Sequence, residues 1–163
     1  MLNLPPPPED SLNLIFKSIV EGFLRNGFKT DVQVLAKPIV ISSIAIFSEI
    51  SKQLRPTPSK SHYTFNLRDI SKVFQGILMA KSSSINRPEK MVRLWMHETC
   101  RVYHDRLINL EDRRWVTHEI IDLLKTCFRI NWDHQAIFED SQIIFGDFMK
   151  RGIALSERSY DEI

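Results

Sequence analysis

Residues 56–76 read PTPSKSHYTFNLRDISKVFQG, and this stretch carries the clearest fold signal in the sequence. Pro56 and Pro58 remove two backbone amide donors and favour an extended approach. Asn66 is a preferred helix N-cap residue, and Asp69 follows at the three-residue spacing of a capping box. Apolar side chains then recur at helical spacing, at Leu67, Ile70, Val73, Phe74, Ile77 and Leu78. The stretch therefore predicts an amphipathic helix that begins at residue 67.

Arg68 is the unusual residue of this predicted helix. It lies in the first turn, where unpaired backbone amides and the helix dipole already create a positive potential. A cation there is mildly unfavourable unless an anion also binds, and an arginine beside a helix N-terminus suits a phosphate. The alternative is that Arg68 pairs with Asp69 or lies in solvent. Physical chemistry alone favours this alternative.

Length and composition describe an ordinary globular protein. The 163 residues suit one domain, with 43% hydrophobic and 26% charged residues. A net charge of +2 gives no indication of binding to nucleic acid or to an anionic membrane. The longest apolar run, residues 38–47, is shorter than the ~20 residues that a membrane span needs, and no targeting segment is recognisable. We expect neither nucleic acid nor membrane as a partner, and we expect Cys100 and Cys127 to be reduced, partly buried thiols.

Helical spacing recurs along most of the chain and predicts an all-α fold of about five helices with an irregular C-terminal segment. A Pro-rich lead-in over residues 1–8 precedes a helical domain over residues 9–128. Residues 129–163 are expected to pack on that domain, with room for one short strand. Besides the helix that begins at residue 67, we expect helices at residues 9–24, from Pro38 to about residue 54, at 88–107 and at 111–128.

Apolar stripes support these assignments. In the first helix the stripe comprises Leu12, Ile15, Phe16, Ile19, Val20 and Phe23. Residues 32–54 are rich in β-branched side chains that would suit a strand, but the run is too long for one strand and keeps helical spacing. We therefore predict a helix there, buried on most sides. In the C-terminal segment, the apolar residues expected to pack on the helices are Trp132, Ile143, Ile144, Phe145 and Phe148.

Motifs for catalysis and metal binding are absent from the sequence. It has no GxxxxGK[ST] loop and no apolar strand that ends in paired acids, so the chain cannot by itself hydrolyse a nucleotide in the P-loop manner. His97-Glu98 resembles the start of the HExxH zinc motif, but position 101 holds Arg101. His97 and His104 would lie ~10 Å apart along a helix axis, too far for one metal. With Cys100 between them, we interpret these histidines as helix-surface or core-edge residues and expect no catalytic and no metal-binding residue.

Two other groups of polar residues have structural interpretations. Residues 59–62 contain serines and a histidine, but neither an acid partner nor a glycine elbow accompanies them. We expect loop residues here, with Tyr63 and Phe65 fixing the loop to the core. Residues 113–115, RRW, are balanced by nearby acids, so we interpret them as a solvated helix face and not as a nucleic-acid site.

Residues 56–78, PTPSKSHYTFNLRDISKVFQGIL, resemble the lid-helix segment of the third AAA+ module of dynein heavy chains, and of the axonemal branch in particular. The resemblance covers most of the chain from about residue 10 onward. Further stretches that resemble the family are Leu94-Trp95, His97-Glu98, Arg101-Val102, Asp105-Arg106-Leu107, residues 144–148 and residues 160–162.

The resemblance implies a helical AAA+ lid subdomain, with residues 129–163 leading towards the next module. The phosphate loop and magnesium-binding acids would lie upstream of Met1. Arg68 matches the lid arginine that AAA+ proteins use as a nucleotide sensor, so the implied cofactor is ATP or ADP with Mg in the parent module. No cofactor is expected for these residues in isolation. The parent chain would be an ATP-dependent microtubule motor, whereas this part alone would not be an enzyme.

The implied mechanism is mechanical. The nucleotide state would change the Arg68 contact and rotate the lid, with residues 56–61 and 81–86 as candidate joints. Implied partners are the adjacent AAA+ subdomains of the same heavy chain, and microtubules and other dynein chains through the parent. The implied location is the cytoplasm and cytoskeleton, in the ciliary axoneme. The alternative function is a stand-alone helical interaction module that presents a groove to a partner peptide.

Overall fold

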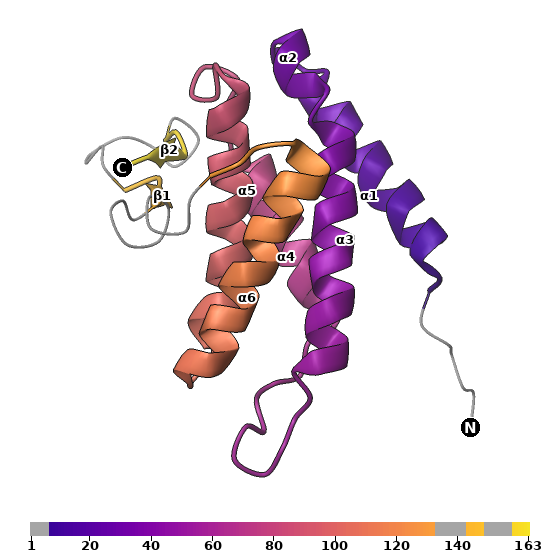
Figure 1. Cartoon of the computed structure of the whole chain (residues 1–163). Coiled ribbons are helices and arrows are strands. Elements are labelled where there is room, and N and C mark those ends of the chain that lie inside the picture. Colours follow the sequence, from indigo (N-terminus) through magenta and orange to yellow (C-terminus); the bar gives the residue numbers. More distant parts are fainter. Residues whose placement is uncertain (1–6, 133–142, 149–157) are drawn as a thin grey trace.

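The fold is helical, as predicted. The computed structural model describes residues 7–132, 143–148 and 158–163. Its longer α-helices are α1 (Glu9–Leu24), α3 (Ala36–Gln53), α4 (Leu67–Leu78), α5 (Pro88–Val102) and α6 (Leu110–Leu123). Helices α3, α5 and α6 run roughly side by side, and α1 crosses α3 obliquely (Figure 1). A short helix, α2 (Thr30–Gln33), connects α1 to α3 and was not predicted.

Helix α1 has the predicted bounds but a narrower buried face. Leu12, Phe16, Val20 and Leu24 are buried at four-residue spacing. Ile15 and Ile19 were predicted to lie inward, but their exposed fractions are 52% and 44%, so that part of the prediction was wrong. The physical reason is that α1 lies at the edge of the bundle and packs on α3 and α4 along one flank only.

Helix α3 is the central element of the core. It contacts α1, α4, α5 and α6, so the predicted burial on most sides is confirmed. Its two inward serines satisfy their hydroxyls within the helix, since Ser42 donates to the Pro38 carbonyl and Ser43 donates to the Ile39 carbonyl at 2.8 and 2.7 Å. Ser43 also accepts a 2.9 Å hydrogen bond from the Trp95 indole, which joins α3 to α5 inside the core.

Residues Thr30–Gln53 are, by length and composition alone, apolar enough to cross a membrane, with a mean hydropathy of 1.6 over the best window. This stretch is longer than the apolar run 38–47 because it also includes the polar residues on either side of that run. In the structure the stretch comprises α2 and α3, and the inward side chains of α3 are covered by four other helices. We interpret it as the core helix of the bundle, because that packing accounts for its apolar character.

The second half of the bundle departs from the predicted bounds. Helix α5 ends at Val102 instead of residue 107, and a 3₁₀ turn, η1 (His104–Arg106), follows it. This turn directs the chain so that Arg106 reaches back to Asp69 on α4. Helix α6 continues into a π-helical turn, η2 (Leu124–Phe128), so the helix predicted over residues 111–128 is confirmed with a widened last turn. Arg129 ends it with a left-handed φ of 58°.

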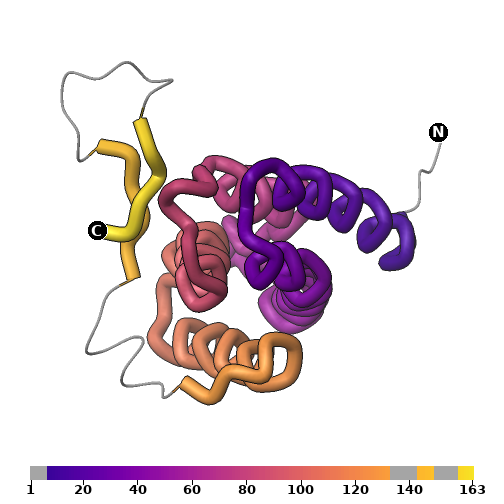
Figure 2. Tube along the Cα trace, turned by 90° about the horizontal axis from the view of Figure 1, so that it is seen from above, coloured from indigo at the N-terminus to yellow at the C-terminus, as the bar shows by residue number. Residues whose placement is uncertain are grey.

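The C-terminal segment forms a small antiparallel strand pair, β1 (Phe145–Gly146) and β2 (Asp161–Glu162). Figures 1 and 2 place the pair beside α5, on the opposite side of the bundle from α1. Phe145 is buried and Trp132 and Ile143 pack on the core, as predicted, but Ile144 and Phe148 are 41% and 63% exposed. The alternation of a strand explains the exposure of Ile144, since neighbouring side chains point to opposite faces.

The polyproline lead-in predicted at the N-terminus falls largely on residues 1–6, outside the described residues.

Candidate functional site

The N-terminus of α4 is fixed by the predicted capping box. Asn66 has extended backbone angles, and its side-chain oxygen accepts a 2.9 Å hydrogen bond from the Arg68 amide. The Asp69 carboxylate in turn accepts a 3.1 Å hydrogen bond from the Asn66 amide. These two bonds define where the helix begins and hence where the side chain of Arg68 emerges.

Arg68 is exposed and does not pair with Asp69. Asp69 is buried and is engaged by other cations, with Arg106 Nη1 at 3.1 Å and Lys72 Nζ at 3.7 Å. Within the described part of the chain, no carboxylate lies at ion-pair distance from Arg68. Of the two predicted alternatives to a phosphate role, pairing with Asp69 is therefore wrong, while exposure to solvent agrees with the structure.

A polar pocket of about 280 Å³ lies beside Arg68. It is formed where the start of α4 meets the end of α5 and the η1 turn. Four cations and one carboxylate are among the residues that line it, which are Thr64, Asn66, Arg68, Asp69, Lys72, Arg101, Val102 and Arg106. This excess of positive charge, together with the amides of the helix N-terminus, favours an anion such as a phosphate.

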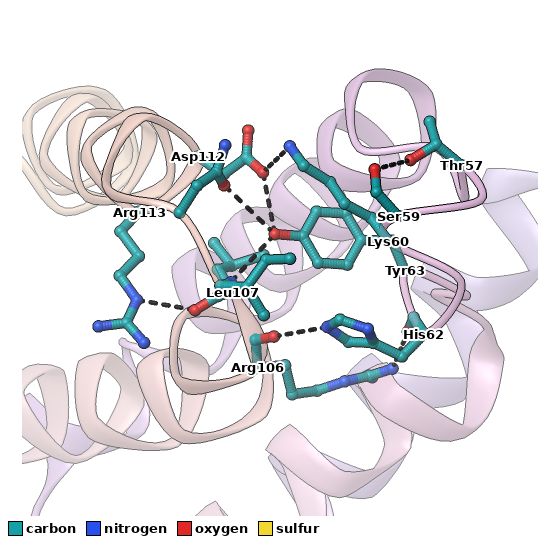
Figure 3. Close-up of polar contacts among 11 residues, drawn as sticks. Thr57, Ser59, Lys60, His62, Tyr63, Arg106, Leu107, Asp112 and Arg113 are labelled. Carbon is teal, nitrogen blue, oxygen red and sulfur yellow. Dashed lines mark hydrogen bonds and ion pairs between the residues drawn. The ribbon is translucent and has the colours of Figure 1, made fainter.

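Arg106 forms a fixed wall of this pocket. Its guanidinium contacts Asp69, donates a 2.9 Å hydrogen bond to the His62 carbonyl and lies 5.0 Å from the centre of the Phe65 ring. The His62 ring in turn lies 3.0 Å from the Arg106 carbonyl oxygen (Figure 3). Three such contacts leave little freedom to Arg106, so the more exposed Arg68 and Lys72 are the better candidates for contact with a ligand.

The loop between α3 and α4 is fixed to α6 at Tyr63 and Lys60. Figure 3 shows both side chains directed at Asp112, with the Tyr63 hydroxyl at 2.9 Å and Lys60 Nζ at 2.6 Å from Oδ2. The Tyr63 hydroxyl also accepts a 3.2 Å hydrogen bond from the Ile108 amide. Burial alone would raise the pKa of Asp112, but the hydrogen bonds from Lys60 and Tyr63 outweigh it and hold that pKa below its usual value. The predicted fixing of the loop by Tyr63 is confirmed, and Phe65 also packs on the core.

A family model described as the AAA+ lid domain matches residues 39–137. This chain belongs to the AAA+ lid domain family. The matched residues include α4, α5 and η1, and therefore the whole pocket around Arg68.

Similar proteins share much of the lid sequence. Human dynein axonemal heavy chain 6 is 44% identical over 163 residues, which is 100% of this chain and 4% of the relative. Mouse dynein axonemal heavy chain 1 is 47% identical over 118 residues, which is 72% of this chain and 3% of the relative. Mouse dynein axonemal heavy chain 12 is 35% identical over 167 residues, covering 95% of this chain and 5% of the relative. The lid thus spans a small fraction of the length of these relatives.

The other sequence-predicted groups have structural contacts within the lid. His97 Nδ1 lies 3.1 Å from the Ile143 carbonyl oxygen, and His104 Nδ1 lies 3.3 Å from an Asp105 oxygen. Burial raises the pKa of the Cys100 thiol to about 12, with a smaller contribution from Asp105. No group of three or more potential ligands for a metal occurs among the described residues. These contacts agree with the interpretation of core-edge residues.

The basic stretch 113–115 is only partly a solvated face. Arg113 donates a 2.8 Å hydrogen bond to the Leu107 carbonyl (Figure 3), and Trp115 packs on the core. Arg114 is exposed, as predicted.

Two residues that line the pocket, Arg101 and Arg106, were not predicted from the sequence. The sequence around Arg101, at the end of α5, does not indicate a pocket, because Arg101 comes near Arg68 only through the long-range packing of α5 on α4.

Proposed function

We propose that this lid is part of a dynein heavy chain, in its third AAA+ module, and that Arg68 senses nucleotide bound by a large subdomain encoded upstream. The observation that carries the proposal is the placement of Arg68. It is exposed in the first turn of α4, at a pocket with excess positive charge, while the neighbouring carboxylate of Asp69 is occupied by Arg106. A phosphate at this place would relieve the unfavourable potential around Arg68. The identities of 35 to 47% to axonemal dynein heavy chains support the parent assignment.

In the proposed mechanism the upstream subdomain holds ATP or ADP with Mg, and Arg68 reaches the terminal phosphate. Loss of that phosphate on hydrolysis or release removes the contact, and the lid rotates as a rigid helical unit. The rotation passes to the adjacent AAA+ subdomain and contributes to microtubule-based movement in the ciliary axoneme. The lid itself supplies no catalytic group in this scheme. Its contribution is a phosphate contact that depends on the nucleotide state.

The test uses a longer protein that includes the subdomain upstream of the lid. Arg68→Ala is expected to weaken the coupling between nucleotide and lid position without unfolding the lid, because Arg68 is exposed and has no ion-pair partner among the described residues. ATP affinity, turnover and the lid position reported by a fluorescent pair are measured in parallel. Arg87→Ala is the matched control, since Arg87 is also exposed and directly precedes a helix. Unchanged affinity, turnover and lid position in Arg68→Ala would rule out the sensor role.

A second candidate function is a stand-alone helical interaction module. A groove of about 520 Å³ favours it, because its lining includes the apolar residues Leu12, Ile44 and Phe47 beside polar and charged ones. The exposed Ile15 and Ile19 on α1 add apolar surface on the same helix as Leu12. The two functions are distinguished by the coding sequence upstream of residue 1. A GxxxxGK[ST] loop within a domain's length supports the AAA+ lid function, and its absence from the transcript supports the interaction module.

A further inference from the structure

Glu98 on α5 is a fully buried carboxylate that lies directly against the backbone of α4. A Cβ atom added at Gly76 would lie only 2.0 Å from the Glu98 carboxyl carbon, so the glycine makes room for this group. A charge that is removed from water in this way is very unfavourable unless it is paired and hydrogen-bonded. The partners of Glu98 are therefore important for the packing of α5 on α4.

Two side chains donate hydrogen bonds to Glu98, and a third, His97, lies nearby with Nε2 at 3.9 Å from Oε1. Arg101 donates to Oε2 through Nε at 2.9 Å and Nη2 at 2.6 Å. The Tyr160 hydroxyl donates to Oε1 at 2.5 Å, and Tyr160 directly precedes β2. Burial raises the pKa of Tyr160, and hydrogen bonding to Glu98 adds to this effect, so the hydroxyl keeps its proton and acts as the donor. Glu98 thus connects one cation to the C-terminal strand pair.

Arg101 is at the same time a lining residue of the pocket beside Arg68. Its side chain is 48% exposed, whereas the Glu98 side chain is 0% exposed. The hydrogen bonds to Glu98 use Nε and Nη2 and do not involve Nη1. Arg101 therefore lies between a buried carboxylate on one side and an open, positively charged pocket on the other.

We propose that Arg101 is a second phosphate-binding arginine of the pocket, and that Glu98 and Tyr160 link phosphate binding to the docking of the C-terminal strand pair. The inference rests on the proposed function in that it takes phosphate as the ligand. A phosphate that binds Arg101 through both Nη1 and Nη2 competes with Glu98, because Glu98 already holds Nη2. As Arg101 turns to the phosphate, Glu98 loses its hydrogen-bonded cation in a buried position. An unpaired carboxylate then favours access of water, which requires the neighbouring Tyr160 contact to open. Phosphate binding and strand-pair docking therefore oppose each other.

Removing a carboxylate near an anion site strengthens anion binding by charge alone, so the competition is recognised by the size of the effect and by the role of Arg101. Glu98→Gln keeps the size of the side chain and an oxygen that can accept from Tyr160, but it no longer competes for Arg101. Inorganic pyrophosphate, titrated into the 163-residue chain in a calorimeter, is expected to bind this variant about fivefold or more tightly than the original chain. Glu89→Gln is the matched control, because it changes the net charge equally at an exposed position on α5. Its effect should stay within about twofold.

Arg101→Gln alone would leave the buried Glu98 carboxylate without its cation, which is a change that unfolds many proteins. The test of Arg101 is therefore made in the double variant Glu98→Gln, Arg101→Gln, which leaves no buried charge unpaired. It is expected to lose the affinity that Glu98→Gln gained. In the original chain, pyrophosphate should also speed hydrogen exchange of the Ile163 amide, which donates to the Ile144 carbonyl across the strand pair at 2.9 Å. In Glu98→Gln, this acceleration should disappear.

The outcomes separate this inference from the sensor role of Arg68. If Arg68→Ala weakens pyrophosphate binding while Glu98→Gln behaves like Glu89→Gln, the inference on Arg101 is wrong and the sensor role stands. If Glu98→Gln tightens binding while Arg68→Ala changes nothing, the inference on Arg101 stands and the sensor role is wrong. If Glu98→Gln binds no pyrophosphate, the inference is overturned.

Discussion

The substitution Gly76→Ala is expected to destabilise the fold, although alanine is the better helix former. Gly76 lies inside α4, where alanine would ordinarily gain ~1 kcal/mol over glycine. Its added Cβ would lie 2.0 Å from the carboxyl carbon and Oε2 of Glu98. Carboxylates at the end of a flexible side chain often move aside at little cost. Glu98 cannot do so freely, because it is buried and held by both Arg101 and Tyr160.

The expected loss follows from these contacts. Breaking a buried ion pair typically costs ~3–5 kcal/mol, and the half-exposed guanidinium of Arg101 places this pair at the lower end of that range. Subtracting the gain in helix propensity of ~1 kcal/mol leaves a net destabilisation of ~2 kcal/mol. In urea unfolding followed by circular dichroism, a slope of ~2 kcal/mol/M converts this into a midpoint lowered by about 1 M.

Gly22→Ala in α1 is the matched control for this experiment. The chemical change is identical, but nothing lies within 4 Å of the added Cβ, so the midpoint should stay or rise. Adding Glu98→Gln to Gly76→Ala should recover part of the loss, because a displaced neutral amide does not leave a buried charge without its partner. A Gly76→Ala chain as stable as Gly22→Ala would show that the Glu98 carboxylate does not hold α5 against α4.

Two further predictions concern the elements that position the pocket. Asn66→Ala removes the acceptor of the Arg68 amide and should lower the free energy of unfolding by ~1 kcal/mol, with a loss under a few tenths contradicting the role of the cap. The pKa of Asp112 is lowered in the fold, so its contribution to stability is present above its unfolded pKa of ~3.9 and is lost as pH falls through the lower folded value. Urea midpoints measured between about pH 6 and pH 2 should therefore fall less for Asp112→Asn than for the original chain, and equal slopes would contradict the coupling to Lys60 and Tyr63.

The contrast between local and long-range contacts explains what the sequence could predict. The capping box at Asn66 and Asp69 was predictable because both of its bonds close within one turn of the chain. Apolar periodicity correctly located α1, but it could not tell that Ile15 and Ile19 face solvent, since periodicity does not say which flank of a helix another helix covers.

The pocket depends almost wholly on long-range packing. Arg68 was a candidate from its position in a first turn, whereas Arg101 joins it only because α4 packs on α5. The function of Glu98 was equally hidden, because its partner Tyr160 lies in a separate segment 62 positions away. A pattern of sequence neighbours carries no information on such contacts, so the charge network behind Arg68 emerged from the structure alone.

The central claim is that Arg68 contacts the phosphate of a nucleotide held by the upstream subdomain. The most direct measurement is an electron cryo-microscopy structure of the longer protein with ATP bound beside this lid. The Arg68 guanidinium is expected at ~3 Å from an oxygen of the terminal phosphate, with Asp69 still engaged by Arg106. A structure with nucleotide bound at that subdomain and Arg68 turned away from it, in solvent or against another module, would contradict the sensor role of Arg68.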